Sequence, residues 1–370
     1  MIDVDVVVVG AGAMGSAAAW RLASEGRSVA LLERFGRGHD RGSSHGSTRI
    51  FRIAYRDARY VHLAVRALPL WRRLEDAAGE VLLEQDGQLD HGHAAAIEEI
   101  AGHLEGTGHP AQVLRPDQAA ERWPGMRFDE AVVYSPEGGR CYADRTVAAC
   151  QRLAAAAGAE VRFDTRVERI EVGTGAASAT VHTADGAWRA PVVVVAAGAW
   201  VAPLLDGVDD VRLPPVVVES DQPSHFRPVD PDTAWPSFLH HMAEESAADH
   251  PLAFHAYGLL SPGEGVKVGG YGTVVPDDAE HRGGISEERR AEQVRYVERW
   301  LPGLDPTPVS TTSCLFTTTP DEHFVLDRRG PVVVCSPCSG HGFKFVPAIA
   351  DEVVSLVAGH PQRESAWRLR

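Results

Sequence analysis

The chain has 370 residues, of which 44% are hydrophobic, as in an ordinary globular protein with room for about two domains. Acidic residues outnumber basic ones by 51 to 36, and the formal net charge of −15 argues against nucleic acid or an anionic membrane as a partner. The start Met1-Ile2-Asp3 lacks the basic region and apolar core of a secretion signal. No run approaches the ~18 apolar residues of a membrane span. Five cysteines are an odd number for a disulfide framework. We therefore expect a cytoplasmic protein with reduced thiols and no membrane contact.

The chain opens with a strand and a glycine-rich turn. Val6-Val7-Val8-Val9 is a β-branched run that suits a parallel strand covered on both faces, and Gly10, Gly12 and Gly15 follow it directly. In such a loop the first glycine permits the tight turn, the second lets the backbone approach a pyrophosphate, and the third lets the next helix pack on the strand. The alternative is a glycine-rich turn without a ligand.

A helix and a second strand complete this unit. We expect the helix over 16–24, with its N-terminal N–H groups and positive dipole end facing the phosphates, and the strand over 28–32. Glu33 closes the strand eighteen positions after Gly15, where a carboxylate would accept hydrogen bonds from an adenosine ribose. The combination predicts a dinucleotide site, which this unit alone leaves open between NAD and FAD.

A loop rich in glycine, serine, arginine and histidine comes next, over residues 34–52. In an acidic protein, such a cluster directly after a cofactor strand could hold the anionic parts of the cofactor or a substrate carboxylate. The alternative is a solvated loop.

The middle of the chain alternates between helices and short strands. We expect helices over 61–76, 94–105 and 144–157, and strands over 87–89, 131–134, 160–163 and 166–170. Residues 83–139 read as an excursion into a second domain. A strong strand over 190–195 runs into Ala196-Ala197-Gly198-Ala199-Trp200, which is either a second close approach to the dinucleotide or a plain strand-to-helix turn.

The last third of the chain carries strands over 216–272, with His240-His241 and Tyr257 among them, and then a helix over 287–300. A strand over 332–335, the sequence Gly340-His341-Gly342-Phe343-Lys344-Phe345 and a helix over 347–357 follow. A strand, a glycine turn and a helix N-terminus here can return to the first sheet and direct backbone N–H groups at a cofactor.

Several of these segments together resemble the monomeric sarcosine oxidase and N-methyltryptophan oxidase family, FAD enzymes of the D-amino-acid-oxidase-like group. The resemblance covers nearly the whole length and rests on the opening glycine motif, residues 42–52, Lys267, residues 314–327 and residues 339–345. It implies a monomer with an α/β fold, in which a Rossmann-like FAD-binding domain takes residues 1–84, 140–215 and 310–370. A discontinuous α+β substrate domain, built on a mainly antiparallel sheet, would take residues 85–139 and 216–309.

The resemblance implies FAD as the cofactor, attached through a thioether from Cys314 to the flavin 8-methyl group. Thiolate attack on that carbon needs nearby cations because the electrophilic ring carries negative charge, and the resemblance supplies His45 and Arg49 as stabilisers. The alternative for Cys314 is an inert buried residue. The expected cofactor-binding residues are Gly10, Gly12, Ala13, Met14, Gly15, Glu33, Arg34, Ser43, Ser44, Arg49, Val167, Ala197, Gly198, Trp200, Cys314, Gly340, Gly342, Phe343 and Lys344.

Lys267 matches the oxygen-activating lysine of that family. Reduced flavin must first pass one electron to O2, and a cation near the ring stabilises the resulting superoxide. Lys267 stands in Gly265-Val266-Lys267-Val268-Gly269, where a lysine is unexpected because burying an unpaired ammonium is costly. The alternative is a strand-edge lysine that faces water.

Arg52 and Lys344 match the pair that holds the substrate carboxylate. Arginine offers a bidentate fork and lysine a point charge, which together fix the orientation of an amino acid. The alternative for each is an ordinary surface charge. Tyr257 is expected as a polar-tipped wall of the substrate pocket, or else as a core tyrosine.

Three features depart from the family pattern and bear on the substrate rather than on the flavin. Phe316 stands where relatives often have tyrosine, Gly270-Tyr271 where some have tyrosine and histidine, and Ser336-Pro337-Cys338 where a glycine and an aromatic residue are commoner. Cys335 and Cys338 also form a CxxC, but no second CxxC or histidine pair completes a zinc site, so we expect no metal.

We therefore expect an FAD-dependent oxidase of a secondary or N-methyl amine that carries a carboxylate. Hydride transfer to the flavin would give an imine that hydrolyses, and O2 would be reduced to hydrogen peroxide. One alternative is a flavin dehydrogenase that acts on a related cyclic or N-alkyl amine and uses another electron acceptor. Others are a flavin-binding redox sensor that uses Cys335 and Cys338, and an NAD dehydrogenase, against which the C-terminal half counts.

Overall fold

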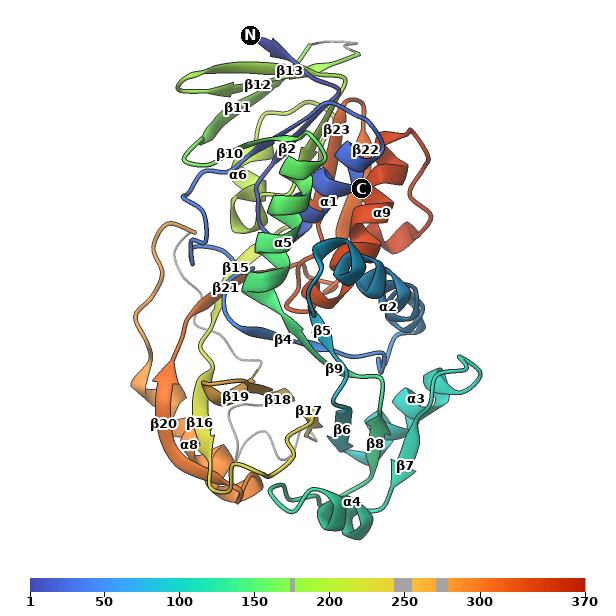
Figure 1. The fold of residues 1–370 in the computed structure, drawn as a ribbon, viewed down its shortest axis with the longest axis vertical. Helices are drawn as coiled ribbons and strands as arrows, with labels where there is room; N and C mark the ends of the chain where they lie inside the picture. Colours follow the sequence, from blue (N-terminus) through green and yellow to red (C-terminus); the bar gives the residue numbers. More distant parts are fainter. Residues whose placement is uncertain (174–176, 243–254, 271–278, 370) are drawn as a thin grey trace.

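The computed structural model describes residues 1–173, 177–242, 255–270 and 279–369. Figure 1 shows a six-stranded sheet with its helices in the upper half of the molecule and an eight-stranded sheet in the lower half. Strands β4 (Thr48–Phe51) and β9 (Gly139–Tyr142) run between the two. Among the described residues, none of the helices is both long enough and apolar enough to cross a membrane.

The six-stranded sheet has the order β10-β3-β2-β14-β23-β22, and its pairs are parallel except that of β22 with β23. The last strands of the chain therefore lie beside the first, as the sequence predicts. The strands are β2 (Val6–Val9), β3 (Val29–Leu32), β10 (Glu160–Arg162), β14 (Val192–Val195), β22 (Val325–Arg329) and β23 (Val332–Ser336).

Successive valines of β2 face two different cores, because side chains of a strand alternate between its faces. Val6 and Val8 pack with helices α1 (Ala13–Ser24), α2 (Ala58–Ala78), α5 (Ala143–Ala156) and α9 (Val346–Val357). Val7 and Val9 pack with α6 (Val201–Leu205) and with a four-stranded sheet of β1 (Ile2–Asp3), β13 (Gly186–Ala190), β12 (Ala179–Thr183) and β11 (Val167–Val172). The four-valine run is thus covered on both faces.

The eight-stranded sheet has the order β20-β16-β19-β18-β17-β6-β8-β7 and is antiparallel except where β17 meets β6, which confirms the mainly antiparallel sheet expected. Helix α8 (Glu287–Trp300) packs against it through Tyr296, Val297 and Trp300. The strands are β6 (Gln88–Gly92), β7 (Gln112–Leu114), β8 (Val132–Ser135), β16 (Ser224–Pro228), β17 (Ser237–His241), β18 (His255–Ser261), β19 (Gly265–Gly270) and β20 (Leu304–Thr311).

Smaller elements connect the two large sheets. Strand β9 pairs with β4 and with β5 (Leu83–Glu84), and β15 (Val217–Asp221) pairs with β21 (Cys314–Thr318). The remaining elements of the described residues are α3 (Ala94–Leu104), α4 (Pro116–Arg122) and the short 3-10 helices η1 (Gly198–Trp200), η2 (Phe343–Phe345) and η3 (Ser365–Trp367).

The structure corrects two expectations from the sequence. The loop expected over 34–52 ends in strand β4, because Thr48–Phe51 finds an antiparallel partner in β9, about ninety residues away in the chain. The strand expected over 190–195 is two strands in different sheets, because Pro191 has no N–H to continue the pairing. The division into two discontinuous domains stays a prediction.

Candidate active site

The glycine turn between β2 and α1 has no room for side chains at two positions. A Cβ on Gly15 would lie 1.9 Å from the carbonyl oxygen of Gly10, and a Cβ on Gly10 would lie 2.5 Å from that of Ala196. Gly10 also has a φ of +99°, which favours glycine. Helix α1 begins at Ala13, directly after the turn and three residues earlier than expected. The turn therefore has the close strand-to-helix packing that a pyrophosphate site needs.

Glu33 lies directly after β3, beside this turn. Its Oε2 accepts from the N–H of Ala11 at 2.7 Å and its Oε1 from the N–H of Phe35 at 3.0 Å, while His39 Nε2 lies 3.4 Å from Oε1. Burial opposes the charge of Glu33, but the hydrogen bonds from His39, Phe35 and Ala11 together lower its pKa. Glu33 is thus an ionised carboxylate at the end of the second strand, where the sequence places a ribose ligand.

One cavity of about 980 Å³ extends from the glycine turn to the eight-stranded sheet. Every cofactor, substrate or catalytic residue expected from the sequence lines it except Gly15, which is buried under the turn. Its volume is at the upper end of the roughly 300–1,000 Å³ of small-molecule sites. The chain therefore brings the expected site residues to a single cavity large enough for an extended ligand.

Arg34 and Trp200 close one wall of the cavity. The two terminal guanidinium nitrogens of Arg34, Nη1 and Nη2, donate to the Glu280 carboxylate, and Trp200 Nε1 donates to Glu280 Oε1 at 3.0 Å. The Arg34 guanidinium also lies over the Phe35 ring, 4.9 Å from its centroid. Val167, the first residue of β11, also lines the cavity, together with its chain neighbours Arg166 and Glu168.

Two further loops reach the glycine turn. Ser44 Oγ accepts from the N–H of Ala13 at 3.0 Å, which attaches the 34–52 segment to the start of α1. A Cβ on Gly342 would lie 1.8 Å from the Pro337 carbonyl oxygen and 3.5 Å from Met14 Cε. The C-terminal glycine segment therefore does return to the first sheet and packs beside the dinucleotide turn.

Cys314 and Arg49 form a thiol and guanidinium pair in the cavity wall. Arg49 Nη2 donates to Cys314 Sγ at 3.4 Å, and also to the carbonyl oxygens of His45 and Ser43 at 2.7 and 2.9 Å. These backbone contacts fix the guanidinium against the sulfur. Arg49 thus presents a fixed positive charge to the Cys314 sulfur in the cavity wall.

His45 lines the same wall as a neutral imidazole. Burial and the charges of Arg49 and Arg282 lower the pKa of His45 to about 4. Its Nε2 is buried and has no hydrogen-bond partner among the described residues. A buried orphan nitrogen in a cavity wall is a polar position for a ligand to satisfy.

Lys267 projects from β19, an interior strand between β16 and β18, and its side chain is only 6% exposed. Its Nζ donates to the Thr48 carbonyl oxygen at 3.0 Å. Burial, followed by repulsion from Arg49, lowers the pKa of Lys267 to about 8. Lys267 is thus an inward-facing cation of the cavity and not a strand-edge residue that faces water.

Arg52 and Lys344 lie over the same aromatic ring. The Arg52 guanidinium carbon is 3.8 Å from the centroid of Tyr55, and Lys344 Nζ is 5.5 Å from it. Lys344 Nζ also donates to the His341 carbonyl oxygen at 2.8 Å. Burial, followed by the Arg52 charge, holds the pKa of Lys344 well below its ordinary value, and an anion bound beside both side chains would offset this repulsion.

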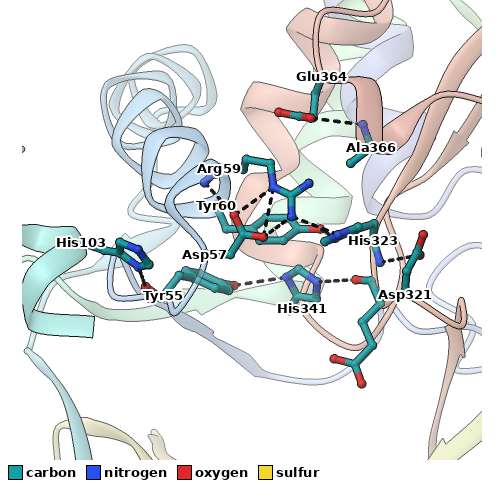
Figure 2. Close-up of polar contacts among 11 residues, drawn as sticks. Tyr55, Asp57, Arg59, Tyr60, His103, Asp321, His323, His341, Glu364 and Ala366 are labelled. Atoms are coloured by element: carbon teal, nitrogen blue, oxygen red, sulfur yellow. Dashed lines mark hydrogen bonds and ion pairs between the residues drawn. The ribbon is translucent and has the colours of Figure 1, made fainter. Parts of the chain in front are cut away.

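The Tyr55 ring is itself held in place, as Figure 2 shows. His341 Nε2 donates to the Glu322 carbonyl oxygen at 3.3 Å, and its Nδ1 therefore accepts from Tyr55 Oη at 3.4 Å. This tautomer agrees with the pKa of His341, which burial and the nearby Lys344 and Arg52 charges keep well below its usual value. Tyr60 and Arg59 of α2 contact His323 in the same view.

Tyr257 does line the cavity, but it has a partner that the sequence reasoning missed. Tyr257 Oη donates to Asp221 Oδ2 at 2.5 Å, and Asp221 also lines the cavity. Burial and the adjacent carboxylate raise the pKa of Tyr257 well above 10, and burial raises that of Asp221. In the sequence, Asp221 followed by Gln222-Pro223 is an ordinary strand end, and nothing local identifies it as a cavity residue.

A second group of residues that the sequence reasoning missed surrounds Lys267. His225 is the strand partner of Lys267, and its Nε2 lies 3.2 Å from Glu264 Oε2. Burial and the Lys267 charge lower the pKa of His225 to about 4. These contacts join strands β16 and β19 to the loop before β19, so only the sheet pairing could have identified them.

The structure locates most of the residues that depart from the family pattern. Phe316 and Gly270 line the cavity, whereas Tyr271 lies outside the described residues. Cys335 and Cys338 line it as well, and Cys338 Sγ lies 3.1 Å from Ser336 Oγ. All five cysteines lie within the described residues, and each is a free thiol.

The lining fits a flavin dinucleotide. The glycine turn and the start of α1 suit a pyrophosphate, Glu33 suits a ribose, and the wall of Arg49, Lys267 and Cys314 suits an electron-poor ring that becomes negatively charged. The orphan His45 Nε2 lies in the same wall.

Comparison with known proteins agrees with this fit. The family model described as FAD dependent oxidoreductase matches residues 5–356. The chain is 32% identical to a monomeric sarcosine oxidase of a Bacillus species over 96% of this chain and 92% of the relative. It is 29% identical to an N-methyl-L-tryptophan oxidase of Yersinia pestis over 96% of this chain and 95% of the relative.

A solved structure gives the same picture for the fold. NikD, described as an unusual amino acid oxidase essential for nikkomycin biosynthesis, superimposes with a TM-score of 0.87 in its open form. The superposition covers 100% of this chain and 98% of NikD at 26% sequence identity. The chain therefore belongs to the FAD-dependent oxidoreductase family, in its amine and amino-acid oxidase group.

Proposed function

We propose that this FAD-dependent oxidoreductase oxidises a secondary or N-methyl amino acid of the sarcosine type and uses O2 as the final electron acceptor. The observation that carries the proposal is the position of Arg52 and Lys344. Both cations lie over the Tyr55 ring in the cavity that also holds the glycine turn, Cys314 and Lys267. A carboxylate held between the two cations would leave the amine end of the same small molecule directed into the rest of the cavity.

Bound FAD would supply the redox chemistry, accepting hydride from the carbon next to the amine nitrogen and passing the electrons to O2 to give hydrogen peroxide. Arg52 and Lys344 would bind the substrate carboxylate and fix the orientation of the molecule. Together with Arg49 and Lys267 they make the cavity cationic, which disfavours an ammonium and selects the neutral amine. Tyr257, held by Asp221, would form a polar wall of the substrate site.

Lys267 would act in the reaction with O2. Its Nζ is anchored to the Thr48 carbonyl oxygen and is nearly shielded from water, so its charge is felt strongly inside the cavity. An ammonium in that place stabilises superoxide, the anion that O2 becomes when it takes the first electron.

Cys314 would attach the flavin covalently. In support, Arg49 Nη2 lies 3.4 Å from the sulfur, and His45 lies in the same wall. Residues 1–84, 140–215 and 310–370 would then form the FAD-binding domain and residues 85–139 and 216–309 the substrate domain. In support, the six-stranded sheet draws its strands from the first set and most of the eight-stranded sheet comes from the second.

The test is a substrate panel with peroxide as the readout. N-methylglycine, N-methyl amino acids with larger side chains, proline and pipecolate are each compared with the amine that lacks the carboxylate. We expect a carboxylate-bearing secondary amine to give peroxide with a much lower KM than its matched amine. Reduction of an artificial dye without peroxide would replace the oxidase by a dehydrogenase, and no turnover of any secondary amino acid would refute the substrate class.

A further inference from the structure

A carboxylate is buried inside the eight-stranded sheet, behind Arg52. Asp90 is on β6, an interior strand between β17 and β8, and its side chain is 0% exposed. All five residues of β6 are buried, so Asp90 has no route to water along its own strand. A carboxylate in such a place is costly unless charged or polar groups surround it.

Both oxygens of Asp90 are held. Gln88 Nε2 donates to Oδ2 at 2.7 Å, and His241 Nε2, from the neighbouring strand β17, donates to Oδ1 at 2.7 Å. The same Oδ1 lies 3.7 Å from Arg52 Nη1. The carboxylate therefore cannot rotate away from Arg52 without losing two short hydrogen bonds.

Arg52 is in this way fixed from two directions. Asp90 lies at the Nη1 edge of the guanidinium, and the Tyr55 ring, which His341 holds as Figure 2 shows, lies across its face. Nη1 also donates to the Ala54 carbonyl oxygen at 3.2 Å. Arg52 lines the cavity, whereas Asp90 and His241 are not among its described lining residues.

We propose that Asp90, oriented by His241, is a positioning residue that holds the Arg52 guanidinium ready for the carboxylate of the substrate. The proposal rests on the proposed function, because it assumes that Arg52 receives a carboxylate. An arginine side chain has several flexible torsions, so fixing it before binding removes an ordering cost that the ligand would otherwise meet. The negative charge of Asp90 also balances the positive charge of Arg52. A single bound carboxylate, paired with Lys344, would therefore leave Asp90, Arg52, Lys344 and the ligand together without net charge.

The test uses the FAD-loaded protein and isothermal titration rather than turnover. The probe is pyrrole-2-carboxylate, a planar carboxylate without an oxidisable C–H next to a basic nitrogen, and the matched control ligand is pyrrole-2-carboxamide. In Asp90→Ala we expect the Kd for the carboxylate to rise roughly tenfold to hundredfold, as for other partners that orient a binding group, with little change for the carboxamide. Asp90→Asn should lie between, because its amide oxygen still accepts.

His241→Gln provides a second variant if Asp90→Ala does not fold, and should weaken carboxylate binding in the same selective way. The ratio of the Kd for pyrrole-2-carboxylate to the Kd for pyrrole-2-carboxamide does not depend on the fraction of folded protein. An unchanged ratio in Asp90→Ala, or in both Asp90→Asn and His241→Gln, overturns the positioning role while leaving the proposed function intact. Absence of carboxylate binding by the unaltered protein overturns both.

Discussion

Replacing Lys267 by methionine should separate the two halves of the proposed reaction. Methionine keeps most of the length and apolar stem of lysine but removes the charge that is anchored at the Thr48 carbonyl oxygen. The variant should still be reduced by substrate at a similar rate, because the residues proposed to bind the carboxylate, Arg52 and Lys344, line another part of the cavity. Its reaction with O2 should be much slower.

The size of the effect follows from the burial of Lys267. A unit charge about 4 Å from an anion, at an effective dielectric constant of about 20, contributes about 4 kcal/mol. If that stabilisation is present when O2 accepts its first electron, its loss slows reoxidation roughly a thousandfold. Lys267→Arg retains the charge and should lose far less.

The same charge predicts a pH dependence. The pKa of Lys267 is lowered to about 8, first by burial and then by Arg49, so the ammonium is present below that pH and is lost as the pH rises through it. An anionic ligand in the cavity would raise this pKa. Reoxidation should therefore fall as the pH rises through the pKa of Lys267 in the flavin-loaded protein, which lies at or above about 8, and Lys267→Met should lose this dependence.

The assay is stopped-flow absorbance of the flavin in two experiments. Anaerobic mixing with substrate gives the reductive rate, and mixing of the reduced protein with O2 gives the oxidative rate. Equal losses in both rates, or a pH profile that Lys267→Met leaves unchanged, would refute oxygen activation by this residue.

Three further outcomes follow from the site. Cys314→Ala should release FAD into the supernatant on acid precipitation, whereas Cys338→Ala, the control thiol from the same cavity, should keep it in the pellet; flavin that stays in both pellets contradicts the thioether. Gly15→Ala should lower Tm and FAD content, because the new Cβ would lie 1.9 Å from the Gly10 carbonyl oxygen and overpacking costs about 1–3 kcal/mol or more. The control Gly284→Ala, whose new Cβ would have no atom within 4 Å, should change neither. Lys344→Met should raise KM for the amino acid about tenfold to hundredfold, as expected for a charge-assisted hydrogen bond, with a smaller change for the carboxylate-free amine; an equal change for both ligands would assign Lys344 another role.

The opening unit could be predicted from the sequence because its signals are local. The four valines, the glycine spacing and the acid at Glu33 each reflect a short-range requirement, and the structure has the strand, turn and helix in that order. Helix α1 begins earlier than expected, at Ala13, because the glycine turn packs tightly between strand and helix. Strand β4 could not be predicted in this way, because its partner β9 is distant in the chain.

The site residues also fall into two groups, those with a local sequence signal and those without one. Residues in recognisable stretches, such as Lys267 in its apolar strand and Lys344 in the C-terminal glycine segment, could be named from the sequence, and the structure brings them to one cavity. Asp221 and Asp90 could not, because an aspartate in a strand shows no local sign of its partner. Tyr257 and His241 meet these carboxylates only through the strand pairing and packing of the folded chain.

The proposed oxidase activity is tested most directly by the visible spectrum of the purified protein. The protein is mixed with N-methylglycine or a larger N-methyl amino acid without oxygen, and air is then added. We predict that the flavin absorbance bleaches, that air restores it, and that about one hydrogen peroxide forms for each flavin. A flavin that no secondary amino acid bleaches, or one that is reduced but recovers only with another electron acceptor, would contradict the proposed oxidase.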